Sequence, residues 1–157
     1  MCKFATCTIA RHQRKSNKVK ILIKKPKKSL KTRDDLIDHV KNNPKINKTI
    51  NLDSPKGSTK KFTGEKPEKL PFDYGEWPSL TNPADNMGWD LIIVPSSDKN
   101  GENLMPVGYV EYNKDKKSDL GNDKIILAPN SSYSDEDKEI IDDFFANLPQ
   151  FADVTWL

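Results

Sequence analysis

Three short apolar segments in the second half of the chain constrain its fold more than any other feature. They are WDLIIVP (89–95), MPVGYVEYN (105–113) and NDKIILAP (122–129), and Pro, Gly, Asn or Asp bounds each of them. Segments of this length that are rich in Ile, Val and Tyr are typical of β-strands. A strand-rich domain is therefore expected, with other elements packed against the strands.

An amphipathic helix is expected after these strands, over residues 132–149. Ser134 is its N-cap and Asp137 completes a capping box, since their side chains can accept the backbone N–H groups that the first turn leaves unpaired. The apolar residues recur at helical spacing and predict one buried face, formed by Ile140, Ile141, Phe144, Phe145 and Leu148.

Further elements are expected before and after this core. Residues 32–43 predict a helix with Thr32 as its N-cap and with acidic residues in its first turn, where the helix dipole favours them. Residues 50–62 predict a strand, a Pro/Gly turn and a second strand. Residues 17–28 alternate apolar side chains with lysines and predict a strand with one basic face. The tail 151–157 adds a last strand or packs as coil.

Several short strands with Gly/Pro turns, followed by one amphipathic helix, predict an α+β fold. The architecture expected is a small OB-like five-stranded β-barrel closed by the C-terminal amphipathic helix. The domain division expected is a basic N-terminal extension over residues 1–48 and the barrel domain over residues 49–157.

The charge of the chain is divided between its two halves. Residues 1–69 hold 20 Lys/Arg against 6 Asp/Glu, a net charge of +14, whereas residues 70–157 hold 6 against 17, a net charge of −11. The basic half is suited to phosphate backbones, anionic lipid or an acidic partner. The acidic half is suited to divalent cations or to packing against the basic half.

The first 32 residues contain eleven Lys/Arg and no Asp/Glu. This composition indicates either an organelle transit segment or an arm that binds nucleic acid. Cys2, Cys7 and His12 lie there too, but no fourth zinc ligand follows at finger spacing, and two ordinary thiols are favoured. No apolar run approaches the ~20 residues that a membrane span needs. A cytoplasmic location is expected, with a mitochondrial location as the alternative.

The stretch ADNMGWDLIIVP (84–95) bears most directly on function. Asp85 and Asp90 bracket a short turn, and a wholly apolar strand follows at once. Carboxylates at the start of a buried strand are suited to a metal site, although Asp and Asn are also common turn residues.

The order of several motifs resembles soluble (family I) inorganic pyrophosphatase. The resemblance covers about two-thirds of the chain, from Ile50 to Trp156. It rests on DSPKGSTKKF (53–62), on PFDYGEWPSLT (71–81), on ADNMGWDLIIVP as the family's Asp-Gly-Asp-Pro-x-Asp signature, and on the two strands within 105–129. The resemblance implies hydrolysis of pyrophosphate with several Mg²⁺ ions, which neutralise its oxygens and activate a water molecule.

The resemblance carries functional roles onto matching residues. Catalysis would fall to Asp85 and Asp90, and phosphate would be held by Lys61, Tyr74 and Lys124. The metal ligands that it implies are Asp53, Asp85, Asp90, Asp119 and Asp123. The last two depend on the register: Ser118 and Asn122 fall near these two positions of the family, and a shift of one residue offers Asp119 and Asp123 instead.

Several positions depart from the family pattern. Met87 stands where the central aspartate of the signature is expected, and a thioether is too soft a ligand for Mg²⁺. Thr63 replaces an acidic residue, and Leu148 and Pro149 replace a Tyr-Lys pair. The hairpin that would carry a phosphate-binding Arg is missing. Lys66 or Lys69 cannot reproduce the bidentate fork of arginine.

The residues that match the family pattern and those that depart from it leave two functions open. The first is a pyrophosphatase-family protein with an eroded Mg-binding site, a pseudoenzyme that serves as a binding or structural subunit. The alternative is an active Mg-dependent inorganic diphosphatase, with Mg²⁺ as its cofactor. The expected partners are pyrophosphate or another phosphate anion, and RNA or a large ribonucleoprotein bound through residues 1–32. A homo-oligomer is compatible with both functions.

Overall fold

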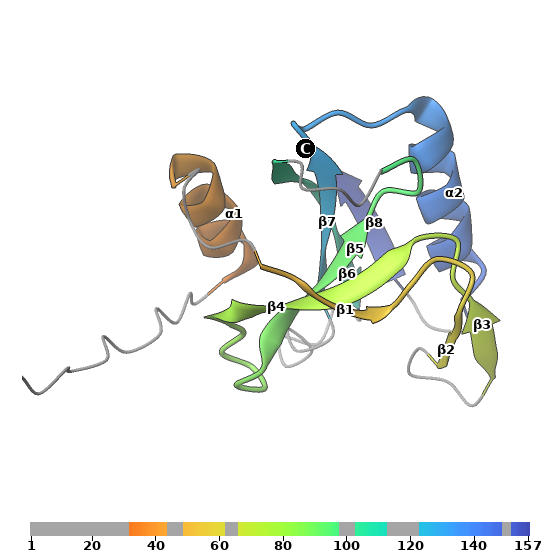
Figure 1. Cartoon of the computed structure of the whole chain (residues 1–157), viewed down its shortest axis with the longest axis horizontal. Coiled ribbons are helices and arrows are strands. Elements are labelled where there is room, and N and C mark those ends of the chain that lie inside the picture. The colour runs from red at the N-terminus through yellow and green to blue at the C-terminus, as the bar shows by residue number, and fades with distance from the viewer. Residues whose placement is uncertain (1–31, 44–48, 62–65, 98–102, 113–122, 149–151) are drawn as a thin grey trace, which may run out of the picture.

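The computed structural model describes residues 32–43, 49–61, 66–97, 103–112, 123–148 and 152–157 (Figure 1). The predicted strand within 17–28 lies outside these residues. The described elements follow in the order α1 (Arg33–Asn42), β1 (Asn51–Ser54), β2 (Thr59–Lys61), β3 (Pro67–Lys69), β4 (Asp73–Thr81), β5 (Gly88–Ile93), β6 (Leu104–Tyr112), β7 (Lys124–Pro129), α2 (Asp135–Ala146) and β8 (Ala152–Trp156).

Six of the strands form one mixed sheet in the order β1-β4-β5-β7-β6-β8. Strands β5 and β7 are parallel, and every other neighbouring pair is antiparallel. Strands β2 and β3 form a separate antiparallel hairpin, which stands apart from the large sheet in Figure 1.

The α+β class is confirmed, whereas the five-stranded OB-like barrel is not. Within the described residues the sheet has six strands and remains open, with β1 and β8 at its edges. The apolar runs of β5 and β7 explain the difference, because Leu91–Val94 and Ile125–Ala128 are buried without a polar alternation. Such strands need cover on both faces, which an open sheet between two helices provides.

Helix α2 covers one face of the sheet. Its Ile141 and Phe145 are buried against Phe72, Ile92 and Ile126, in the positions that the helical spacing predicted. The predicted N-cap is confirmed, since the Ser134 hydroxyl accepts the Asp137 N–H and the Asp137 carboxylate accepts the Ser134 N–H.

Helix α1 covers the opposite face. Leu36 and Val40 pack with Trp77, Trp89 and Leu91, which alternate along their strands with the residues beneath α2. Thr32 caps α1 as predicted. This helix lies within the range assigned to the basic extension, and it contributes fully buried side chains to the core of the sheet (Figure 1).

Candidate functional site

A row of polar residues crosses the sheet on the side of α2. Asn51 on β1 pairs with Glu76 on β4, Glu76 pairs with Asp90 on β5, and Asp90 pairs with Lys124 on β7. Residues directly opposite one another in a sheet project from the same face. The four side chains therefore lie side by side, where the apolar core beneath α2 ends.

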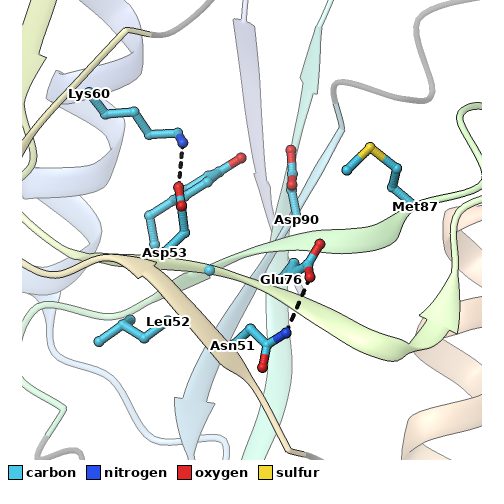
Figure 2. A pocket seen from close by; sticks show the side chains of 9 residues that line it. Asn51, Leu52, Asp53, Lys60, Glu76, Met87 and Asp90 are labelled. Atoms are coloured by element: carbon cyan, nitrogen blue, oxygen red, sulfur yellow. Dashed lines mark hydrogen bonds and ion pairs between the residues drawn. The ribbon is translucent and has the colours of Figure 1, made fainter.

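Three residues of this row, Asn51, Glu76 and Asp90, form the floor of a pocket of about 430 Å³. Figure 2 shows Asp53 and Lys60 pointing toward one another on one side, Met87 on the other side, and Glu76 with Asp90 between them. The lining residues come from β1, β2, β4, β5 and the turn before β5, and are Asn51, Leu52, Asp53, Lys60, Tyr74, Gly75, Glu76, Met87 and Asp90.

Lys124 lies beneath the floor and links two pocket residues. Its Nζ atom donates to Asp90 Oδ2 at 2.9 Å and to the Tyr74 hydroxyl oxygen at 3.2 Å. Burial lowers the pKa of Lys124, and the adjoining Asp90 carboxylate opposes that shift. Burial, together with the same carboxylate, raises the pKa of Tyr74, so its hydroxyl remains protonated at neutral pH.

Lys60 forms the second ion pair of the pocket. Its Nζ atom lies 2.6 Å from Asp53 Oδ2 and 4.5 Å from the centre of the Tyr74 ring. The hydrogen bond from Lys60, together with one from Ser54, lowers the pKa of Asp53. Because the Lys60 side chain is 26% exposed and the Asp53 side chain is 55% exposed, both groups can exchange partners with a ligand.

Three of the residues predicted for the site come together here, namely Asp53, Tyr74 and Asp90, with Lys124 directly beneath them. Lys61, the predicted phosphate ligand, is exposed and does not line the pocket. The side chains of neighbouring strand residues point to opposite faces, and on β2 it is Lys60 that faces Tyr74.

The other predicted carboxylates lie elsewhere. Asp85 is exposed, and its carboxylate accepts the Met87 N–H at 2.9 Å, which makes it a turn residue. Asp123 is buried and pairs with Arg33 of α1, at 3.2 Å, rather than with the pocket. Asp119 lies outside the described residues.

Lys60 and Glu76 also line the pocket, although neither was predicted as a site residue. The spacing of Glu76 from Tyr74 could have indicated it, because residues two positions apart on a strand project from the same face. Lys60 carried no comparable signal, since β2 is only three residues long and its register depends on β3.

The donor set does not fit the multi-magnesium cluster that the resemblance implies. Asp53 and Asp90 are each engaged by a lysine, and Met87, which is 62% exposed, offers a thioether at the rim. In the described part of the chain, no group of three or more His, Cys, Asp or Glu side chains is arranged to hold a metal ion.

Comparisons of the chain with family models, with curated proteins and with solved structures return no match. Among the described residues, neither helix has the length and apolar character needed to cross a membrane.

Proposed function

We propose that this chain is a pyrophosphatase-like binding protein that holds diphosphate, as its magnesium complex, without the turnover of a pyrophosphatase. Lys60, Lys124 and the Tyr74 hydroxyl supply hydrogen-bond donors in and beneath one pocket, and phosphate oxygens are strong acceptors for such donors. The pocket of about 430 Å³ is also suited to a small ligand.

The pairing of carboxylates with lysines is the observation that carries this proposal. Asp53 is paired with Lys60 at 2.6 Å and Asp90 with Lys124 at 2.9 Å. With Glu76 added, the fully ionised pocket has one net negative charge, which is too little to gather several divalent cations. A diphosphate that brings its own Mg²⁺ carries less charge than the bare anion, and it can use both the lysines and the carboxylates.

Calorimetric titration of the full chain with magnesium diphosphate tests this function, and the matched variants are Lys60→Met and Lys61→Met. Loss of a charged hydrogen bond costs about 1.5–3 kcal/mol, so Lys60→Met is expected to weaken binding about tenfold or more. Lys61→Met changes the same charge at an exposed site outside the pocket, and it is expected to leave the affinity unchanged. Absence of heat with the unmodified chain, or equal losses in both variants, would contradict the proposal.

A second candidate is an active Mg-dependent inorganic diphosphatase. The observation that favours it is that Asp53, Glu76 and Asp90 share one pocket. Phosphate release from pyrophosphate in the presence of Mg²⁺ separates the two candidates. Release above background that Asp90→Asn abolishes would replace the binding function with this enzymatic one.

For the basic extension we propose binding to RNA, alone or in a ribonucleoprotein. The eleven cations of residues 1–32 are the support for it, because each contact with a phosphate releases a counterion and makes the affinity depend on salt. Deletion of residues 1–32 is expected to reduce the slope of log affinity against log salt. An unchanged slope would remove this role.

A further inference from the structure

A second groove, of about 660 Å³, lies at the base of the β2–β3 hairpin. None of its residues lines the diphosphate pocket. They come from the turn before β2, the segment from β3 to β4, and the loop after β5, and are Lys56, Gly57, Lys69, Leu70, Pro71, Asp73, Pro95 and Ser97.

Two lysines line this groove. Lys56 and Lys69 are exposed, and neither has an ion-pair partner among the residues that the structure describes. Lys61 and Lys66, on the same hairpin, are exposed and unpaired in that same part of the chain. Among the described residues that line the groove, Asp73 alone is acidic, and its Oδ1 atom accepts the Lys56 N–H at 2.7 Å. The described residues that line the groove therefore carry one net positive charge.

The backbone fixes the two lysines of the groove in place. The Gly57 N–H donates to the Leu70 carbonyl at 2.8 Å, and the Leu70 N–H donates to the Ser58 carbonyl at 2.9 Å. Gly57 has a φ of 89°, in the left-handed region that favours glycine, so the turn after Lys56 depends on this residue. A fixed backbone lowers the entropy lost when lysine side chains bind a ligand.

The groove is not only cationic. Pro71 and Pro95 are half-buried and give it an apolar wall, with Leu70 at its base. A nucleotide unit presents one phosphate charge and one flat base, whose faces pack on aromatic or apolar side chains. An acidic peptide supplies the charge, but it has no flat apolar group in each repeating unit.

We infer that this groove binds single-stranded nucleic acid, with phosphates on Lys56 and Lys69 and a base against Pro71 and Pro95. The inference goes beyond the diphosphate pocket, and it adds a contact separate from the basic extension. The groove would bind the nucleic-acid backbone without sequence specificity, because lysines contact phosphates and the apolar wall can pack against any base.

Fluorescence anisotropy of a labelled single-stranded RNA with the full chain, over a series of salt concentrations, tests the inference. For single strands the slope of log affinity against log salt changes by about 0.7 for each phosphate contact. The double variant Lys56→Gln/Lys69→Gln is therefore expected to reduce the slope by about 1.4, the value for two contacts. The control Lys41→Gln/Lys138→Gln makes the same charge change on the two helices, and it is expected to leave the slope unchanged.

Two further measurements complete the test. An abasic oligonucleotide of the same length is expected to bind more weakly than the intact one, since it lacks the group that packs on the prolines. The groove double variant is expected to bind magnesium diphosphate normally, so failure of the pocket and failure of the groove are distinguishable. An unchanged salt slope, equal binding of the abasic strand, or equally effective competition by polyglutamate would overturn the inference.

Discussion

Two ion pairs lie next to one another at the start of β7, on opposite faces of the sheet. Asp123, the residue before the strand, pairs with Arg33 of α1 at 3.2 Å, and Lys124, its first residue, pairs with Asp90 at 2.9 Å. The Arg33 guanidinium also contacts Glu111 at 3.4 Å and stacks on the Tyr109 ring at 3.6 Å. The chemistry of the two pairs is similar, but their surroundings differ.

The difference lies in what water and ligands can reach. The Arg33 and Asp123 side chains are 13% and 2% exposed, so their pair joins α1 to the sheet and is closed to a ligand. Asp90 is 31% exposed and lines a pocket, so the second pair is open at its carboxylate end. A buried pair between two elements has a structural role, whereas a pair at a pocket floor can exchange its partners with a ligand.

The largest expected effect on stability is that of breaking the buried Arg33–Asp123 pair. Arg33→Ala leaves the Asp123 carboxylate buried without its cation, and it is expected to lower the free energy of unfolding by about 3 kcal/mol or more. Urea denaturation measures this effect. Lys41→Ala, an exposed cation at the other end of α1, is the control and is expected to stay within about 0.5 kcal/mol of the unmodified chain. Equal effects of the two variants would contradict the structural role of the pair.

The second prediction concerns pH. Burial raises the pKa of Asp123 from 3.8 to about 6, against the opposing effects of the Tyr112 N–H and Arg33. Between these values the folded state binds more protons than the unfolded state, so stability falls as pH rises. The expected loss from pH 4 to pH 6 is about 2 kcal/mol relative to Asp123→Asn, which does not titrate. The free energy of unfolding is measured for both proteins by urea denaturation at a series of pH values. If it changes with pH in the same way for both, Asp123 has an ordinary pKa.

Breaking the Lys124–Asp90 pair at the pocket floor is expected to change ligand binding more than stability. Lys124→Met removes a buried ammonium group and leaves a carboxylate that water reaches, so the stability is expected to change by only about 1 kcal/mol. Binding of magnesium diphosphate is expected to be lost. Thermal denaturation and calorimetry measure the two effects separately. A loss of stability as large as that of Arg33→Ala would show that the two pairs have the same role.

The smallest expected effect on stability is that of Met87→Asp, because this side chain is 62% exposed. The change is expected to stay within about 0.5 kcal/mol. A further carboxylate at the rim is expected to tighten Mg²⁺ binding about tenfold, or about 1.4 kcal/mol, as measured by calorimetry. Asn86→Asp adds the same charge outside the pocket lining and serves as the control. Equal gains in both variants would indicate a general charge effect rather than a new ligand.

Local patterns predicted both helices and the strands β5, β6 and β7, but they did not predict β3 or β4 as strands. The N-caps Thr32 and Ser134 and the apolar face of α2 were all predictable, because caps and helical spacing involve residues a few positions apart. The apolar runs of β5 and β7 likewise predicted strands. The α+β class followed from these elements, but the open sheet did not, since strand order depends on contacts between distant segments.

The candidate site divides in the same way. The motif resemblance implied roles for Asp53, Tyr74, Asp90 and Lys124, and these four residues lie in or beneath one pocket. Only the tertiary structure decided that Lys60 rather than Lys61 faces Tyr74, and that Asp123 pairs with α1 rather than with the pocket. The reason is physical: adjacent strand residues project from opposite faces, so the face that each one reaches depends on register and on the packing of distant elements.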